Sequence, residues 1–463
     1  MNKVLRKMIS ALPNIESAIN SDEIPIISKQ EYLCRIQAAL KQSFGKYSYL
    51  IIYADREHFS NMEYFTGYDP RFEEALLILS EGQAPTIIVG DEGQSYAEKI
   101  PYDINIVVYP TFSLPNQPRN RNIKLSNILE DTGIKKDSKV GIIGWKSFDK
   151  DDFTNFQQQY DLPFFIMSEI FKIVEMKNLE NAINIMVGNE NGLRHNLDAK
   201  ELVLCEIAGT KSSRNTYNVL RNLEDGISEQ AASGFLNIDG DPLTAHPNIN
   251  FGENIFYALA SPSSKRKLQN GDLVGVGMAY RRSLCHKISF FVNNATELNA
   301  DVESIYDIYF QAITKWYERV AIGSVAGEVY EAVKNIVADF AKMGIALNPG
   351  HLIHTDEWTN SPFVEGSEIV LCSGMAIQCD FTASLPELNI AVHAEDGIIL
   401  ASNEMQKEIN AIAPQAYQRM INRREFMINV LGINIDSTVL PTSDMPAVIF
   451  PYLRNLNCVL ANK

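Results

Sequence analysis

The segment that most constrains the fold is residues 271–292, which read G-D-L-V-G-V-G-M-A-Y-R-R-S-L-C-H-K-I-S-F-F-V. It looks like a strand hairpin. Neighbouring side chains on a strand point to opposite faces of the sheet. Cys285 and His286 are therefore expected on different faces, which argues against a catalytic couple of a thiol and a base at this point.

The segment resembles the metal-binding strand hairpin of the pita-bread group, which includes creatinase, aminopeptidase P, prolidase and methionine aminopeptidase. This resemblance is the basis for the expected hairpin. The matching segment in that family reads D-L-V-x-x-D-x-G-x-x-Y followed by S-D-I-T-R-T-F, and its two aspartates bind two metal ions. With a slightly shortened hairpin, the first aspartate position falls on Gly277 and the second on Lys287. The resemblance therefore implies a degenerate metal site.

Three further segments are similar to those that carry the family's remaining metal ligands. The segment P-G-H-L-I-H-T-D-E-W places His351 on the ligand histidine, and G-M-A-I-Q-C-D places Asp380 on a ligand glutamate. The segment V-H-A-E-D places Glu395 on the bridging glutamate. The resemblance thus implies that two of five ligand positions keep their residue type, one carries a shorter acid, and two are lost.

A fourth segment, F-G-E-N at residues 251–254, resembles a family turn that precedes a histidine in contact with the reacting carbonyl. The equivalent position here is about Leu259, so that histidine is absent. The nearest upstream candidate to replace it is His246, which lies in P-L-T-A-H-P-N. A plain turn residue before Pro247 is an equally good interpretation of His246.

Charge arithmetic on the family alignment predicts a site without metal. The family's four carboxylates offset two divalent cations, whereas Lys287 with Asp380 and Glu395 would give the cavity a net charge of about −1 before any metal is added. On this alignment Lys287 is an internal counter-ion, either to Asp380 or to Glu395. No cofactor is then required.

The lead functional hypothesis is a metal-independent hydrolase of a small carbon–nitrogen bond, as in creatinase, or a binder of such a ligand. His351 or His246 would carry the proton, Glu395 would orient it, and Lys287 would stabilise developing negative charge. Two alternatives stay open. One is an X-Pro aminopeptidase or dipeptidase with a rewired site that holds manganese, zinc or cobalt. Its ligands would come from His351, His354, Asp356, Glu357 and His393. The other is a non-catalytic scaffold.

The first half of the chain alternates helices and strands. A helical stretch at residues 29–43 precedes an apolar, β-branched strand at residues 49–54. The segment N-M-E-Y-F-T-G-Y resembles the amino-terminal domain of the same family. We therefore expect an α/β creatinase-like domain over residues 1–160 and an α+β pita-bread domain over residues 165–463.

Length and composition exclude several other classes. A chain of 463 residues exceeds one ordinary core, and 46% apolar with 21% charged residues is typical of a globular protein. A net charge of −16 opposes binding of nucleic acid or anionic membranes. The scattered cysteines predict neither disulfides nor a thiolate metal site. Without a secretory signal we expect a cytoplasmic protein, and the resemblance implies a homodimer that takes a short peptide or small molecule.

Overall fold

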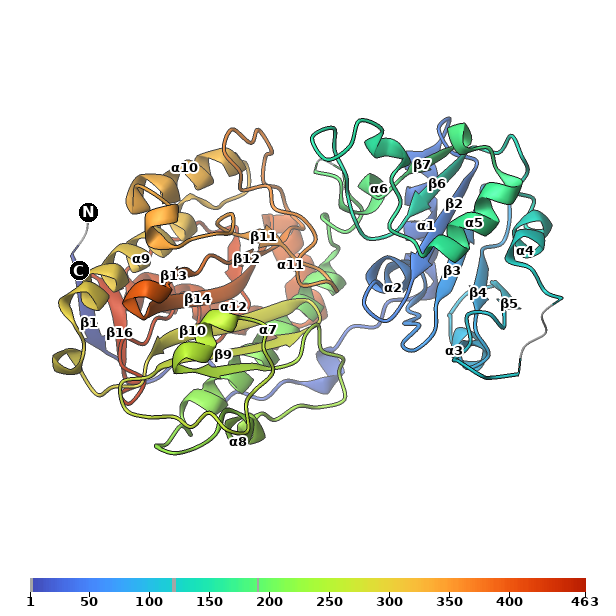
Figure 1. Cartoon of the computed structure of the whole chain (residues 1–463). Coiled ribbons are helices and arrows are strands. Elements are labelled where there is room, and N and C mark those ends of the chain that lie inside the picture. The colour runs from blue at the N-terminus through green and yellow to red at the C-terminus, as the bar shows by residue number, and fades with distance from the viewer. Residues whose placement is uncertain (1–2, 119–121, 190) are drawn as a thin grey trace. The chain divides into compact units, whose positions relative to one another are not determined.

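The computed structural model describes residues 3–118, 122–189 and 191–463. The chain divides into two compact units, which are Ile26–Arg194 and the combination of Met1–Pro25 with His195–Lys463 (Figure 1). The division expected at residues 160–165 thus falls inside the first unit, and the first 25 residues belong to the second. The reason is a long-range pairing, because strand β1 (Val4–Met8) lies antiparallel to β16 (Cys458–Asn462) at the other end of the chain.

The amino-terminal unit is an α/β domain built on a mixed sheet. Its strand order is β5-β4-β3-β2-β6-β7, with antiparallel pairing on both sides of β3 and parallel pairing elsewhere. The strands are β2 (Tyr49–Ala54), β3 (Ala75–Leu79), β4 (Thr86–Val89), β5 (Asn105–Val108), β6 (Val140–Ile143) and β7 (Leu179–Asn181). The helices are α1 (Lys29–Ser43), α2 (Ser60–Thr66), α3 (Gly93–Ala97), α4 (Leu125–Asp131), α5 (Phe164–Ile173) and α6 (Asn184–Val187).

Strand β2 shows why this sheet is covered on both faces. Alternate side chains enter different cores, with Leu50 and Ile52 in one and Ile51 and Tyr53 in the other. This period of two with apolar residues on both faces is typical of a sheet between helical layers. Helix α1 begins at a capping box, in which Ser28 Oγ accepts from the Glu31 amide while Glu31 accepts from the Ser28 amide. The α/β domain expected here is confirmed.

The carboxy-terminal unit is an α+β domain around an antiparallel sheet. The main path is β11-β12-β14-β10-β9-β8, and β13 and β15 also pair with β14. The strands are β8 (Asn248–Phe251), β9 (Leu273–Tyr280), β10 (Ser283–Phe290), β11 (His351–Leu352), β12 (Ala376–Cys379), β13 (Ala383–Leu385), β14 (Ile390–Leu400) and β15 (Val439–Pro441). The helices are α7 (Ala199–Leu220), α8 (Glu229–Ala232), α9 (Ala300–Arg319), α10 (Ala326–Val337), α11 (Asn403–Ile412) and α12 (Pro414–Phe426).

Two helices of this unit have well-defined positions or ends. Helix α7 is a single long helix that packs on β9 and β10. Helix α10 stops at Val337, because Ala338 turns out of the helix with φ +63°. No helix among the described residues is long and apolar enough to cross a membrane.

Candidate active site

The candidate site lies on one face of the sheet where β9, β10, β14, β12 and β11 run side by side (Figure 1). The strand register places Gly277 opposite His286, and His286 opposite Glu395. Residues two apart on a strand share a face, so His393 joins Glu395 on β14. His351 on β11 and Asp380 directly after β12 complete the group.

Lys287 is not part of this group. It is paired with Ala394 on the opposite face of the sheet, where its Nζ donates to Asp396 Oδ2 at 2.5 Å and to the Met445 carbonyl at 3.1 Å. Both members of this ion pair are buried. The predicted placement of Lys287 in the cavity, as a counter-ion to Asp380 or Glu395, is therefore wrong by one residue, because a shift of one position reverses the face of a strand.

His286 occupies the position that the alignment gave to Lys287. Its ring lies over the two glycines of β9: a Cβ on Gly277 would stand 3.0 Å from His286 Cδ2, and one on Gly275 would stand 3.3 Å from Nε2. A larger side chain at position 277 would displace the imidazole. The imidazole at position 286 therefore depends on glycine at position 277, since an acidic side chain at 277 would occupy the space of the ring.

The imidazole of His351 faces a cluster of carboxylates. Its Nε2 lies 3.1 Å from Glu357 Oε1, 3.7 Å from Asp380 Oδ2 and 3.9 Å from Glu395 Oε1. Among the described residues, none of these contacts is aligned as a hydrogen bond. His351 is fully buried, so its ring nitrogen lies among acids in a place with little water.

The loop after β11 brings two of its own residues back to His351. The chain reverses through hydrogen bonds from the Leu352 amide to the Asn360 carbonyl, at 2.7 Å, and from the Thr359 amide to the Leu352 carbonyl, at 3.0 Å. This reversal places Glu357 at the His351 nitrogen and stacks Trp358 on its ring, with centroids 4.1 Å apart and planes at 17°. The loop therefore fixes the orientation of His351.

Hydrogen bonds link Asp380, His393 and His286. His393 Nε2 lies 2.9 Å from Asp380 Oδ1, and His393 Nδ1 lies 2.9 Å from His286 Nδ1. On the far side, Gln378 Nε2 donates to Glu395 Oε1 at 3.3 Å. Asp380 thus contacts His393 with one oxygen and faces His351 with the other.

Burial and mutual charge shift the protonation equilibria of the group. Burial, Asp380 and Glu357 raise the pKa of Glu395 well above its usual value. Burial alone would lower the pKa of His351, but the carboxylates, Glu357 foremost, raise it well above its usual value. Burial would raise the pKa of Asp380, but His393 and His351 lower it. Burial and His393 lower the pKa of His286 to about 3, so its ring is neutral.

Two other candidates lie outside the group. His246 is exposed, and its Nε2 lies 3.0 Å from the carbonyl oxygen of Leu259. It therefore contacts the backbone at the position where the family histidine was expected. Among the described residues, it belongs to no group of three side chains placed to hold a metal ion. His354 Nε2 lies 3.4 Å from Glu201 Oε2, away from His351 along the same loop.

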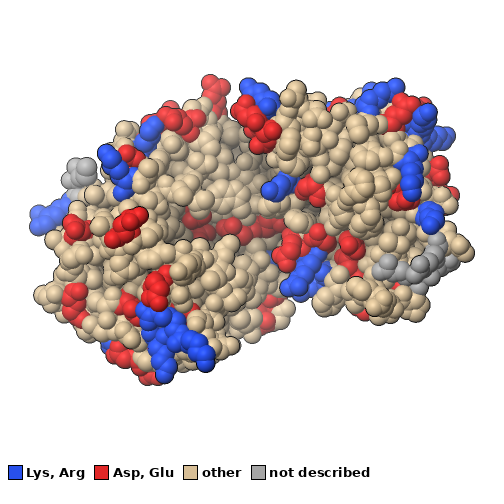
Figure 2. Space-filling view, viewed as in Figure 1, with Lys and Arg blue, Asp and Glu red and all other residues tan. Residues whose placement is uncertain are grey.

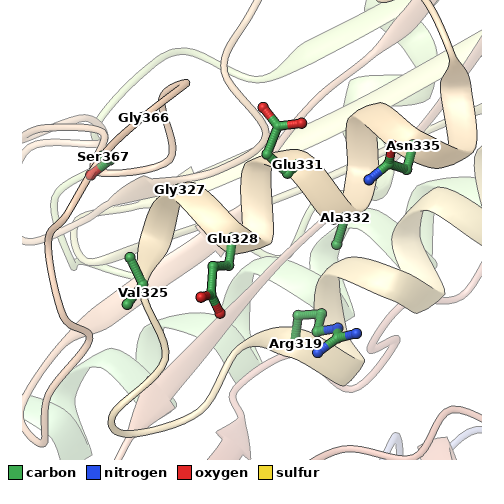
Figure 3. A pocket seen from close by; sticks show the side chains of 9 residues that line it. All are labelled: Arg319, Val325, Gly327, Glu328, Glu331, Ala332, Asn335, Gly366 and Ser367. Carbon is green, nitrogen blue, oxygen red and sulfur yellow. The ribbon is translucent and has the colours of Figure 1, made fainter.

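The carboxy-terminal unit has an acidic hollow on one face. Figure 2 shows a row of acidic side chains in a hollow of the carboxy-terminal unit, on the left of the view. Such a hollow focuses a negative potential that attracts cations. A second, open pocket lies on α10 and is lined in part by Arg319, Glu328 and Glu331. Figure 3 shows Glu328 and Glu331 pointing to different sides of α10, and none of the candidate site residues lines this pocket.

No protein-family model and no curated protein sequence matches the chain. Solved structures do match it. A prolidase from Pyrococcus horikoshii OT3 is 17% identical, with a TM-score of 0.61 over 79% of this chain and 95% of that one. An Xaa-Pro dipeptidase from Bacillus anthracis is 14% identical, with a TM-score of 0.60 over 81% and 95%. An X-Pro aminopeptidase from Thermotoga maritima MSB8 is 12% identical, with a TM-score of 0.55 over 77% and 93%.

The chain has the pita-bread fold of these peptidases. At such identities the likeness concerns the fold, and the chemistry has to come from the residues of this chain. The match covers 77–81% of this chain, which is more residues than the carboxy-terminal unit contains, so it extends into the amino-terminal α/β unit.

The residues of this pita-bread site fit a divalent metal ion. Ligand atoms of His351, Asp380 and Glu395 all lie within 4.8 Å of one another, and a second group of His286, His393 and Glu395 meets the same criterion. Neutral imidazole and carboxylate oxygen are ligands for zinc, manganese and cobalt. His351 Nε2 lies among three acids without a well-aligned hydrogen bond, and a metal ion could bind this nitrogen together with the surrounding carboxylate oxygens.

Sequence reasoning missed His286 and gave His393 only a secondary place. His393 carried a readable signal, because it stands two residues before Glu395 on a strand and so shares its face. His286 needed the register of the hairpin. Its turn is Arg281–Arg282, with Arg282 at φ +82°, and it lacks the Gly or Asn residues that usually locate a two-residue turn.

Proposed function

We propose that the chain is a hydrolase of a carbon–nitrogen bond in a short peptide or small amide, and that its site holds one divalent metal ion through His351, Asp380 and Glu395. The observation that carries the proposal is the convergence of these three residues within 4.8 Å. The argument against metal depended on the charge of Lys287. That charge is neutralised by Asp396 on the other face of the sheet.

The corrected charge balance favours a cation. Asp380, Glu395 and Glu357 surround His351 and, against the effect of burial, raise the pKa of its imidazole, so that without metal a proton on this ring offsets part of their negative charge. A metal ion bound at Nε2 would take the place of that proton. The raised pKa of Glu395 records the mutual repulsion of these acids, after the effect of burial itself. A divalent ion would offset this repulsion and hold all its ligands deprotonated.

The residues around the proposed metal position then have distinct roles. The bound metal would supply Lewis-acid activation of a carbonyl and of a water molecule. His393 positions Asp380 through the contact at 2.9 Å, as partners of metal ligands commonly do. Glu357 lies 3.1 Å from His351 Nε2 and is a candidate to accept a proton from water. Trp358 keeps His351 in place by stacking.

The first test is elemental analysis of the purified protein after incubation with manganese, zinc and cobalt and removal of free ions. We expect the wild type to retain metal, and His351→Ala to retain much less, because the substitution removes a nitrogen ligand. His246→Ala is the matched control and should retain as much metal as the wild type. Equal retention in all three proteins would show that the ions bind elsewhere.

The substrate test uses X-Pro dipeptides and tripeptides beside small amides and amidines that lack proline. The solved structures with this fold are named as prolidases and X-Pro peptidases, which makes X-Pro peptides the first choice. Release of the amino-terminal residue should require metal and should be lost in His351→Ala. Metal binding without turnover of any of these compounds would contradict the hydrolase assignment and leave a metal-dependent binding protein.

A second candidate function is hydrolysis without metal, and the hydrogen-bond chain from Asp380 through His393 to His286 favours it. A carboxylate that holds one imidazole against another can orient a neutral base in the absence of a cation. Chelation separates the two candidates. Turnover that persists at full rate in a protein shown to be metal-free supports this second mechanism and excludes the first.

A further inference from the structure

The edge strand β8 carries two asparagines on the face of the sheet that holds the candidate site. Its sequence N-I-N-F alternates polar and apolar residues, and Ile249 and Phe251 enter the hydrophobic core. Because side chains alternate between the two faces of a strand, Asn248 and Asn250 point to the other face. Asparagine is depleted in strands, since it gains little from packing on a sheet. These two residues therefore need an explanation other than strand formation.

The strand register connects Asn248 to the candidate site. Asn248 lies opposite Gly277, which lies opposite His286. His286 in turn lies opposite Glu395. Residues directly opposite each other on neighbouring strands place their side chains on the same face. The four positions therefore form one row across the sheet, from Glu395 to the edge strand. At about 4.8 Å between neighbouring strands, the row is about 14 Å long.

Glycine at position 277 brings Asn248 close to the site. A Cβ on Gly277 would stand 3.3 Å from Asn248 Cβ and 3.0 Å from His286 Cδ2. The side chains of Asn248 and His286 thus approach the same point above the glycine, from opposite sides. Asn248 is therefore a direct neighbour of the site.

Thr244 supplies a second polar side chain next to Asn248. The chain before β8 pairs with β9, where the Thr244 amide donates to the Ala279 carbonyl at 3.0 Å. This pairing places Thr244 opposite Ala279. Ala279 stands two residues after Gly277 on β9 and shares its face. Thr244 and Asn248 are therefore neighbours on the face that carries the site.

The side-chain oxygens of this pair are buried without a protein partner. In the described part of the chain, neither Thr244 Oγ1 nor Asn248 Oδ1 has a hydrogen-bond partner. Such atoms are rare in folded proteins, because burial without a partner costs stability, and they commonly mark functional positions. Asn248 Oδ1 can only accept a hydrogen bond, whereas the Thr244 hydroxyl can also donate one. Together they suit a group that has one N–H and one C=O, which describes a peptide amide.

We propose that Thr244 and Asn248 form a subsite for a secondary amide of the substrate, whose N–H donates to Asn248 Oδ1 and whose C=O accepts from Thr244 Oγ1. The inference rests on the proposed function in that the scissile bond is placed at the group of His351, Asp380 and Glu395. An extended peptide covers about 14 Å with about four residues. The substrate class that reaches both ends is a peptide of three or more residues with a backbone N–H away from the scissile bond.

The subsite also predicts which ligands bind poorly. A tertiary amide has no N–H, so a proline or an N-methylated residue at this position leaves Asn248 Oδ1 buried and unpaired. Sites that hydrogen-bond a polar group of the substrate discriminate strongly against analogues that lack this group. Loss of a single N–H from the peptide is therefore the most direct probe of the subsite.

The experiment measures the binding of tetra-alanine and its three singly N-methylated forms to the wild type in excess chelator, by isothermal titration calorimetry. We expect one of the methylated forms to bind about tenfold more weakly than the parent peptide, because it leaves a buried acceptor unpaired. Asn248→Leu should bind this form and the parent equally. Asn335→Leu changes an exposed asparagine of α10 and is the matched control, which should keep the wild-type preference.

Stability gives a second measurement that needs no ligand. Asn248→Leu removes a buried oxygen without a partner, so the urea midpoint of the variant should equal or exceed that of the wild type while its affinity for tetra-alanine falls. If leucine prevents folding, as judged by circular dichroism, Asn248→Ala repeats both measurements. A clear loss of stability in the alanine variant would show that the amide supports the fold, and it would overturn the subsite.

The outcomes separate this inference from the proposed function. An equal preference among the four peptides in the wild type and in Asn248→Leu overturns the subsite, because Oδ1 then meets only water. Cleavage of small amides with unchanged kcat/KM in Asn248→Leu, and no binding of tetra-alanine, overturns the subsite and leaves the proposed function intact. Binding of tetra-alanine through Asn248 without cleavage in the presence of metal supports the subsite and contradicts the hydrolase assignment.

Discussion

Lys287→Met should lower the free energy of unfolding of the carboxy-terminal unit by about 3–5 kcal/mol, the usual cost of removing one partner from a buried ion pair. Lys287 and Asp396 are both buried, and the substitution leaves Asp396 with the Ala447 amide at 2.9 Å but without its cation. Urea denaturation followed by the fluorescence of the buried Trp316 measures the change. This is the largest stability effect that we expect from a single substitution near the site.

The effect should depend on pH in a defined direction. Burial raises the pKa of Asp396 even though Lys287 opposes the shift. Removal of the ammonium group therefore penalises the ionised form of Asp396, and protonation relieves the penalty. The loss of stability in Lys287→Met should shrink as the pH falls into the acidic range and should be largest at neutral and alkaline pH.

Lys334→Met is the matched control, because Lys334 forms its ion pairs with Glu331 and Glu365 at the surface. Exposed pairs of this kind contribute about 0–1 kcal/mol. If Lys287→Met proved as mild as Lys334→Met, Lys287 would be solvated rather than held by Asp396. Lys287 would then again be a candidate active-site residue.

The case of Lys287 shows where sequence reasoning on this chain reaches its limit. The segments around His351, Asp380 and Glu395 could be placed from the sequence, because each carries several matching residues on one strand. The hairpin could not be placed to the residue, because its length differs from the family pattern and its turn is Arg281–Arg282. An alignment error of one residue placed Lys287 in the cavity and His286 outside it. The conclusion that the site has no metal depended on this placement, because it assigned the positive charge of Lys287 to the cavity.

The division of the chain into units shows a second limit. The α/β character of residues 29–54 could be predicted, because an apolar, β-branched run of that length after a helical stretch indicates a buried strand. The pairing of β1 with β16 could not be predicted from the sequence, because no local sequence pattern links Val4 to Asn462. For the same reason, the loop that returns Glu357 and Trp358 to His351 depends on contacts that no spacing rule predicts.

Glu395→Gln should change stability in opposite directions with and without metal. In metal-free protein, burial and the neighbouring Asp380 raise the pKa of Glu395 well above its usual value. A carboxyl group with a raised pKa favours the folded state below its unfolded pKa, and this contribution is lost as the pH rises toward its folded pKa. Over that window the wild type should lose up to about 1.4 kcal/mol per pH unit from this group.

Glutamine has no proton to lose, so in excess chelator the variant should become more stable than the wild type as the pH rises above about 4.5. With zinc present the order should reverse. Glu395 is shared by both ligand groups, and an ion at 100 times its dissociation constant stabilises the folded protein by about 2.7 kcal/mol. Unfolding in urea at several pH values, with chelator and with zinc, measures both signs.

Glu387→Gln supplies the control, because Glu387 is exposed in the turn before β14 and should give the wild-type curve in both conditions. A Glu395→Gln variant that is less stable than the wild type at pH 8 in chelator would mean that Glu395 is ionised and stabilising in the metal-free fold. In that case an internal cation, such as protonated His351, would already balance the acids. The site would then not need a metal ion, and the relay from Asp380 to His286 would become the favoured mechanism.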